Sequence, residues 1–351
     1  MKSYEYVSIG GKYFCTQQSV FRLMLFAALH RKTCPSFVNG PSLLRLFLHR
    51  SGTKRYAASF ELPMRGAWCL RVNNGYKLFD PYARVVTKIY DDTTDKDLIA
   101  KELKHQSMIG EHSFAPRLIK SSEEEAWYQE EMMMGKTGMY FSPETTRDFM
   151  RIYSSEIAPT LADLATLHPE TRVKISTYIE HMPDSIQSEI DRITDQDAQT
   201  GHLAQNFFDD ALTSLQEISN EEVSLVFAHG DFHLYNLFTT DKGVMLTDWE
   251  GIGQQSLLFD LFTFFFSHLW TGKSEDNLIE SIEQGIRELA NRVESQNKAM
   301  ALEIIENADK YLKLYYVERL YGYATTFRQT PESLRQWVQV YIEYEENAAR
   351  N

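Results

Sequence analysis

The stretch AHGDFHLYNLF, residues 228–238, places two histidines, an aspartate and an asparagine between apolar residues. A carboxylate that is buried is costly unless it is paired, so this pattern needs an explanation. One explanation is a turn in which Asp231 and Asn236 cap the local backbone. The other is chemical, because a carboxylate can orient a hydroxyl group and an amide oxygen can bind a hard cation such as Mg²⁺. A second aspartate, Asp248, follows in LTDWE, and the turn explanation does not account for it.

The elements around this stretch can bring the three side chains together. Residues 225–227 are expected to form a strand, and NLF and VMLT a hairpin across TTDKG. Asp231 and Asn236 then lie on the loop before the hairpin, and Asp248 lies just after its second strand. The spacing Asp231-x4-Asn236 is that of the D-x-x-x-x-N loop of enzymes that transfer phosphoryl groups. The sequence therefore predicts a site at which these side chains face a common point.

The pattern along the chain changes twice. Residues 17–31 and 41–50 have the apolar spacing of helices. The runs AWCLRV, YKLF and RVVTKIY, separated by NNG and DPYA, predict an antiparallel meander. The helix DKDLIAKELKHQSMIG follows, and then the strand-like runs PRLIKS and AWYQEEMMM. From residue 135 the pattern is mostly helical apart from residues 225–250.

Composition limits the function. The chain has 351 residues, of which 43% are hydrophobic and 13% aromatic, as expected for a globular protein. A net charge of −13 argues against nucleic acid as a partner. The three cysteines, Cys15, Cys34 and Cys69, are too few and too scattered for a disulfide framework and fit a reducing compartment. The N-terminus lacks the apolar core of a signal peptide, and no apolar run reaches the length of about 20 residues that spans a membrane. We expect a soluble, cytoplasmic protein.

The charge is distributed unevenly. Residues 1–60 contain nine Lys or Arg residues and a single acidic residue, Glu5, whereas the rest of the chain is acidic. A basic amphipathic segment of this kind can make peripheral contact with an anionic membrane surface. It can equally form a basic layer that packs against the acidic body of the same molecule. Both explanations stay open.

HGDFHLYN followed by LTDWE resembles the aminoglycoside phosphotransferase and choline kinase family, which has the protein-kinase-like fold. Asp260 in LLFDLFTF and the segment LADLATLH, residues 161–168, also resemble the pattern of that family. The resemblance covers about residues 67–265 and is strongest over residues 229–260.

The resemblance implies a two-lobed α+β architecture, and the helical spacing near the N-terminus adds an extension to the two lobes. Residues 1–56 would be a basic helical extension, and residues 57–134 a small antiparallel-sheet N-lobe that binds the nucleotide. Residues 135–351 would be a large helical C-lobe that carries the catalytic loop and the metal site. The implied cofactors are ATP and Mg²⁺.

The resemblance also implies roles for the aspartates and asparagine. Asp231 would be the catalytic base, and Asn236 and Asp248 would be the Mg²⁺ ligands. Asp260 would orient the catalytic loop. The histidines His229 and His233 would be scaffolding of the loop rather than acid–base groups.

Nucleotide-binding residues are expected upstream. Lys88, flanked by apolar residues in VVTKIY, can reach the phosphates if an acidic residue holds it, and Glu102 on the following helix is the expected partner. A register error of one turn would replace these by neighbours on the helix, namely Lys101, Lys104 and Glu111.

Two further segments are expected to contact the nucleotide. The linker QEEMMMG would bind adenine through its backbone around Glu131 to Met133, unless its methionines only fill core. A G-x-G-x-x-G loop is absent from the sequence. The turn with Asn74 and Gly75 is the expected cover over the phosphates, with residues 63–67 as the alternative.

These features predict a kinase that transfers the γ-phosphate of ATP to a hydroxyl group of a small molecule or sugar. The acidic body favours a cationic acceptor such as an amino alcohol or aminosugar, whereas the basic N-terminus favours a membrane-linked glycan such as a lipopolysaccharide sugar. A kinase-like binding module without turnover and a protein serine/threonine kinase are the alternatives. The tyrosines of the C-terminal third either pack in the core or line an acceptor pocket: Tyr311, Tyr315, Tyr316, Tyr321, Tyr323, Tyr341 and Tyr344.

Overall fold

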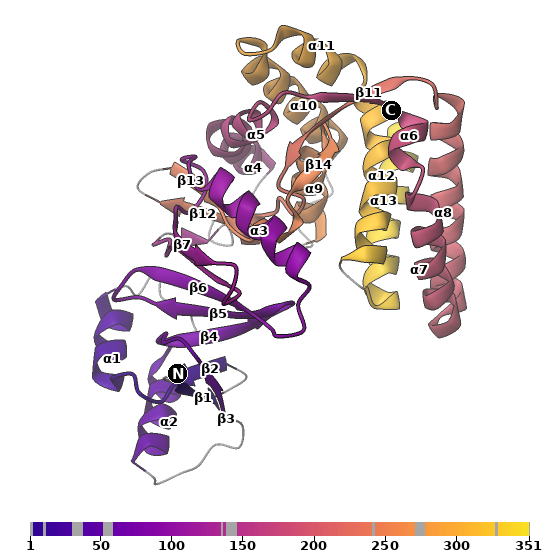
Figure 1. Cartoon of the computed structure of the whole chain (residues 1–351). Coiled ribbons are helices and arrows are strands. Elements are labelled where there is room, and N and C mark those ends of the chain that lie inside the picture. Colours follow the sequence, from indigo (N-terminus) through magenta and orange to yellow (C-terminus); the bar gives the residue numbers. More distant parts are fainter. Residues whose placement is uncertain are drawn as a thin grey trace. The chain divides into compact units, whose positions relative to one another are not determined.

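The chain folds into two compact units in the computed structural model (Figure 1). The first unit comprises Met1–Tyr140 and Leu237–Trp249, and the second comprises Phe141–Asn236 and Glu250–Asn351. The structure describes residues 3–9, 12–29, 38–51, 59–134, 136–137, 146–240, 243–270, 278–326 and 329–350.

The first unit is built on an antiparallel sheet of eight strands in the order β3-β1-β2-β4-β5-β6-β8-β7. Its elements are β1 (Tyr4–Ile9), β2 (Lys12–Cys15), α1 (Val20–Leu29), α2 (Gly40–Arg50), β3 (Ser59–Leu62), β4 (Trp68–Val72), β5 (Gly75–Asp80), β6 (Val85–Tyr90), α3 (Lys96–Ile109), β7 (Leu118–Ser122), β8 (Trp127–Glu131), β9 (Lys136–Thr137), β12 (Leu237–Thr240) and β13 (Gly243–Leu246). The expected meander is therefore confirmed as β4, β5 and β6, and the helix after it as α3. Asp95 caps this helix by accepting a hydrogen bond from the backbone N–H of Asp97.

The N-terminal segment is not purely helical as expected. Helices α1 and α2 form, but strands β1 and β2 precede them and extend the sheet through β3 on one side and β4 on the other. The reason is the burial of alternating or neighbouring apolar side chains such as Tyr6, Val7 and Phe14, each of which has no exposed surface. Five of the nine basic residues of the segment lie outside the described residues, namely Lys2, Arg31, Lys32, Lys54 and Arg55, and so does Cys34.

The expected hairpin is confirmed as β12 and β13, with Leu237 opposite Leu246. Strand β12 also pairs with β9, and the backbone N–H of Leu246 donates to the carbonyl oxygen of Phe114 at 2.7 Å. The hairpin thus belongs to the first unit, although the sequence suggested that it would lie with the helical region.

The second unit is mostly helical, and Figure 1 shows α7, α8, α12 and α13 running side by side. A short strand, β11, pairs on either side with β10 and β14. The elements are α4 (Thr146–Ile152), a π-helical turn (Tyr153–Ile157), α5 (Ala158–Ala165), β10 (Thr171–Lys174), α6 (Ile175–Ile179), α7 (Met182–Gln196), α8 (Ala198–Glu217), β11 (Glu222–Ala228), a 3₁₀ turn (Leu234–Asn236), a second 3₁₀ turn (Trp249–Gly251) at the boundary with the first unit, β14 (Gly253–Ser256), α9 (Phe259–Trp270), α10 (Leu278–Glu294), α11 (Lys298–Glu306), α12 (Ala308–Thr325) and α13 (Pro331–Arg350).

Aromatic side chains fill the core of the second unit. Tyr315 stacks on Phe266 with ring centroids 5.6 Å apart, and Tyr341 meets the same phenylalanine edge-on at 5.0 Å. Most of the C-terminal tyrosines are therefore buried in the core. This agrees with the first of the two roles considered for them from the sequence, core packing.

Two observations concern the cysteines and membrane-spanning helices. Cys15 and Cys69 are buried free thiols, while Cys34 lies outside the described residues. Within the described parts of the chain, no helix combines the length and the apolar character that crossing a membrane requires.

Candidate active site

The buried side chain of Asp260 holds the loop that carries Asp231 by hydrogen bonds to its main chain. Strand β11 ends at Ala228, and Asp260 in the first turn of α9 accepts hydrogen bonds from the backbone N–H groups of His229, at 2.6 Å, and Gly230, at 3.0 Å. Gly230 has a φ of +83°, and a Cβ atom there would lie 2.1 Å from the carbonyl oxygen of Gly251. Only glycine fits this position, so the loop is fixed through its main chain.

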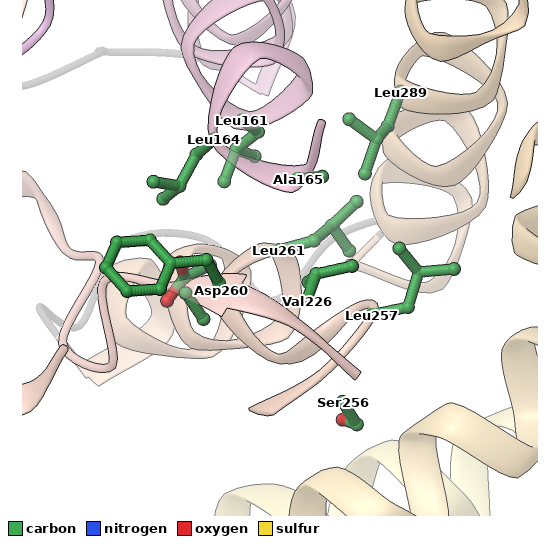
Figure 2. A pocket seen from close by; sticks show the side chains of 11 residues that line it. Leu161, Leu164, Ala165, Val226, Ser256, Leu257, Asp260, Leu261 and Leu289 are labelled. Atoms are coloured by element: carbon green, nitrogen blue, oxygen red, sulfur yellow. The ribbon is translucent and has the colours of Figure 1, made fainter. Parts of the chain in front are cut away.

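The space behind the loop is too small for a substrate. Figure 2 shows Asp260 among the side chains that line a cavity with Leu161, Leu164, Val226 and Leu261. The cavity has a volume of about 10 Å³, which is room for one water molecule at most. Burial raises the pKa of Asp260 to about 7, although the two backbone hydrogen bonds lower it. The cavity is therefore too small for a substrate, and Asp260 acts here as a support of the loop.

Asp231 is held from several directions. Its Oδ2 atom lies 3.1 Å from Nε2 of His233 and accepts a hydrogen bond from Nδ2 of Asn236 at 3.2 Å. Its Oδ1 atom lies 3.8 Å from Nη2 of Arg319 on α12. Burial raises the pKa of Asp231, but the hydrogen bond from His233, with Arg319 and His229, outweighs burial and brings the pKa to about 2. The carboxylate is therefore ionised at neutral pH.

The two histidines fix the loop, as the family resemblance implies. Nδ1 of His229 accepts the backbone N–H of Asp231 at 3.2 Å. Nδ1 of His233 accepts the backbone N–H of Tyr235 at 3.2 Å. In neutral His233 the proton must then be on Nε2, where it points to Asp231. His233 thus contacts the candidate base directly, which the sequence did not predict.

The expected lysine–glutamate pair forms in the first unit. Nζ of Lys88 lies 2.9 Å from Oε2 of Glu102, and the lysine side chain has no exposed surface. The hydroxyl of Tyr90 donates to the same oxygen at 2.6 Å, and the lysine ammonium also lies over the ring of Tyr90 at 4.7 Å. Glu102, and not its neighbours on α3, is therefore the partner of Lys88.

Besides Lys88, the sheet of the first unit carries Lys77, which contacts Asp248. The sequence did not predict this contact. Lys77 pairs directly with Lys88 across β5 and β6, so the two side chains share one face of the sheet. Nζ of Lys77 lies 2.7 Å from Oδ1 of Asp248. The alternation in YKLF could have placed Lys77 on that face, but nothing local indicates its contact with a residue 171 positions away.

The expected covering turn has a structural reason for its glycine. Gly75 has a φ of +149°, and a Cβ atom there would lie 1.9 Å from the carbonyl oxygen of Ile89. The carbonyl oxygen of Asn74 accepts the backbone N–H of Asp91 at 3.0 Å. Phosphate binding by Asn74 and Gly75 stays a prediction.

Two backbone N–H groups of the linker at the end of β8 are used in hydrogen bonds within the first unit. The backbone N–H of Glu131 donates to the carbonyl oxygen of Arg117 at 2.9 Å, and that of Met132 donates to Arg84 at 2.8 Å. The next backbone N–H group is that of Met133. Adenine binding by Glu131 and Met133 stays a prediction.

The donor set fits Mg²⁺. Asn236 directs its amide nitrogen at Asp231, so the amide oxygen is the other end of the side chain. Asp248 has a left-handed backbone, with a φ of 68°, and its carboxylate already holds the ammonium of Lys77. An amide oxygen and a carboxylate are hard ligands of the kind that Mg²⁺ takes alongside water and phosphate. In the described residues no group of three His, Cys, Asp or Glu side chains could hold a metal ion by itself. Asn236 belongs to the second unit and Asp248 to the first, and their meeting with Asp231 stays a prediction.

Comparison with known proteins supports the kinase-like architecture. Residues 142–316, just under half of the chain, match the model of the ecdysteroid kinase-like family. A glucosamine kinase in complex with glucosamine, ADP and inorganic phosphate is similar in structure, with a TM-score of 0.51 and 13% identity over 76% of each chain. A choline kinase from Cryptosporidium parvum Iowa II has a TM-score of 0.53 and 13% identity over 80% of this chain and 88% of its own. No curated protein matches the sequence. The resemblance found in the sequence is confirmed, and so is the two-lobed α+β fold.

Proposed function

We propose that this chain, which has the protein-kinase-like fold of small-molecule kinases, transfers the γ-phosphate of ATP to a hydroxyl group of a small molecule or sugar. The observation that carries the proposal is the position of Asp231, which accepts a hydrogen bond from Asn236 and follows two residues whose backbone N–H groups donate to Asp260. The buried pair of Lys88 and Glu102 supports it from the nucleotide side.

Asp231 would orient the attacking hydroxyl. A carboxylate with a pKa of about 2 is a weak base, so it accepts a hydrogen bond from the hydroxyl before it takes the proton. This suits the loose transition state of phosphoryl transfer, in which the attacking oxygen loses its proton late. His233 and Asn236 hold the other carboxylate oxygen in place.

The first unit would bind the nucleotide. Lys88, fixed by Glu102, would contact the phosphates, and the turn with Asn74 and Gly75 would cover them. The backbone at Glu131 and Met133 would meet the adenine edge, with Met133 as the first N–H group not used by the strand pairs described above. Asn236 and Asp248 would hold Mg²⁺, which when bound neutralises charge on the phosphates.

The test is ATP-dependent phosphorylation of a cytoplasmic metabolite extract, with products identified by mass. We expect Asp231→Asn to lower the rate by about 10²–10⁴-fold while ATP binding is kept. Asp195→Asn, an exposed aspartate on α7, is the matched control and should leave the rate unchanged. An unchanged rate in Asp231→Asn would exclude Asp231 as the base. ATP binding without any product would favour the kinase-like binding module instead.

We also propose that α1 and α2 make peripheral contact with an anionic membrane surface, where a membrane-linked glycan sugar would be the acceptor. Both helices turn large apolar side chains to solvent, and Arg22 and Arg45 are exposed beside them. Apolar groups interspersed with cations fit a membrane of negative charge. The exposed apolar side chains are Phe21, Met24, Leu25, Leu29, Leu44 and Phe47.

Sedimentation with phosphatidylcholine vesicles, with and without 30% phosphatidylglycerol, tests this contact. We expect binding to the anionic vesicles and its loss in the triple variant Phe21→Ser, Leu25→Ser, Phe47→Ser. Leu302→Ser on α11, which is also an exposed leucine, should bind like the wild type. Equal sedimentation of the triple variant would remove the proposal. If the wild type proves to be dimeric, the triple variant monomeric, and neither binds vesicles, the face is instead a contact with a second copy of the chain.

A further inference from the structure

A buried arginine stands beside the candidate base. Arg319 on α12 is 7% exposed, and its Nε donates to the hydroxyl of Tyr323 at 3.1 Å. The guanidinium carbon lies 5.0 Å from the ring centroid of Tyr323 and 5.4 Å from that of Trp337 on α13. Both rings are themselves buried. Two aromatic faces near Asp231 are thus covered by a cation from the same chain.

The same guanidinium faces the carboxylate that would orient the acceptor. Nη2 of Arg319 lies 3.8 Å from Oδ1 of Asp231. An acceptor whose hydroxyl bonds to Asp231 therefore has its neighbouring groups a few ångströms from a permanent positive charge. All these residues belong to the second unit, so the arrangement is a property of that unit alone.

This charge has consequences for what can bind. Proteins commonly recognise ammonium and quaternary ammonium ligands by placing them over aromatic rings. Here the rings of Tyr323 and Trp337 already hold Arg319, so a cationic acceptor would have to displace a buried guanidinium or bind next to it. Displacement is unfavourable because Arg319 would lose its contacts with the two rings and with Asp231. Binding next to Arg319 is unfavourable because like charges a few ångströms apart repel strongly in a protein interior. An acceptor oxygen in the same place would instead be attracted.

We propose that Arg319 makes the acceptor subsite selective for a compound that presents oxygen, not a cation, beside its reacting hydroxyl: a neutral polyol or sugar, or a hydroxy acid. The inference rests on the proposed phosphotransfer at Asp231. It disfavours the cationic amino alcohols and aminosugars that the acidic composition suggested. Arg319 is a specificity-determining residue in this scheme.

The reaction itself is an ordinary substitution at phosphorus. The acceptor oxygen forms a bond to the γ-phosphorus of ATP, the bond from that phosphorus to the β–γ bridging oxygen breaks, and ADP leaves with the electron pair. The hydroxyl proton passes to Asp231 and then to solvent. Arg319 takes no part in these bond changes and acts only on which acceptor is bound.

Matched acceptors that differ in charge provide the test. Choline is compared with its neutral isostere 3,3-dimethylbutan-1-ol, and glucosamine with glucose, by the ratio of their kcat/KM values. We expect the wild type to favour the neutral member of each pair by at least about 10-fold. Arg319→Met should lower that ratio by about 10-fold or more, whereas Arg319→Lys, which keeps the charge, should leave it within about 3-fold of the wild type.

The ratio is taken within one variant, so a general loss of activity through Asp231 cancels. Circular dichroism and melting temperature show whether each variant is folded. If Arg319→Met is too slow for kinetics, calorimetric binding of tetramethylammonium to the ADP complex replaces the ratio, with binding expected only in the variant. A wild type that prefers choline or glucosamine, a ratio unchanged in Arg319→Met, or equal tetramethylammonium binding would overturn the proposal.

The metabolite extract separates this inference from the proposed function. Product from a neutral or anionic hydroxyl compound supports both. A phosphorylated amine as the main product would overturn the role of Arg319 and leave the kinase assignment intact. No product with any compound would remove the phosphotransferase function, and the inference on Arg319 with it.

Discussion

Glu102→Gln is expected to destabilise the first unit by about 3–5 kcal/mol, because it leaves the ammonium of Lys88 buried without its carboxylate. We expect a large loss because the pair is close and shielded from water: Nζ of Lys88 lies 2.9 Å from Oε2 of Glu102, and the exposed fractions of the two side chains are 0% and 9%. Glutamine has the same shape and can still accept the hydroxyl hydrogen of Tyr90, so the charge is the main change.

The size of the loss follows from what the variant leaves behind. Removing one partner of a buried ion pair costs about 3–5 kcal/mol, because the remaining charge stays buried without compensation. The complete burial of the Lys88 side chain places the loss in this range, and not near that of an exposed pair, which is at most about 1 kcal/mol.

Urea unfolding of the wild type and of Glu102→Gln at pH 7 measures this loss. Trp68 and Trp127, which lie in the sheet of the first unit, report its unfolding by fluorescence. Glu111→Gln, an exposed glutamate just after α3, should change stability by less than about 0.5 kcal/mol. The double variant Lys88→Met, Glu102→Gln should recover most of the loss, because both charges are gone. A loss below about 1 kcal/mol in Glu102→Gln would refute the reasoning.

Three further changes have defined outcomes. Gly75→Ala should cost more than about 1 kcal/mol, because the new Cβ would lie 1.9 Å from the carbonyl oxygen of Ile89, while Gly322→Ala, with open space around it, should be neutral or stabilising in the same denaturation assay. Burial raises the pKa of Glu318 from 4.5 to about 7. Between these two pH values the folded state keeps a proton that the unfolded chain has released, so the stability of the folded state falls as the pH rises from 4.5 to about 7. The stability of Glu318→Gln relative to the wild type should therefore increase by about 1–3 kcal/mol from pH 5 to pH 8, and a difference that stays constant would contradict the shift. Lys77→Met should weaken ADP binding about 10-fold by calorimetry if the side chain reaches the phosphates, and unaltered affinity would restrict Lys77 to its contact with Asp248.

Local patterns predicted the elements that depend on neighbours in the chain. The meander, the hairpin of β12 and β13, and the helix capped by Asp95 all follow from alternation, turn residues and caps within a few positions. The pair of Lys88 and Glu102 was expected from the strand-lysine and helix-glutamate pair of the kinase template, and the two side chains do meet in the structure.

Other features depend on contacts between distant segments, and local patterns do not encode them. Strands β1 and β2 were missed, although YEYVSI and KYFC around two glycines have the composition of a hairpin. Arg319 lies in the helical run YYVERLYGY, where only its spacing on α12 is visible, and its approach to Asp231 comes from the packing of the helix bundle. The placement of the hairpin in the first unit follows from its pairing with β9, which the sequence does not show.

The two main-chain hydrogen bonds between Asp260 and the loop have a practical consequence for protein engineering. The main chain just before Asp231 is held through the N–H groups of residues 229 and 230, and these two hydrogen bonds do not depend on the side chains that surround the acceptor. Libraries that aim to change the substrate can therefore vary Arg319, while residues 229, 230 and 260 and the core aromatic side chains of α12 and α13 are kept fixed.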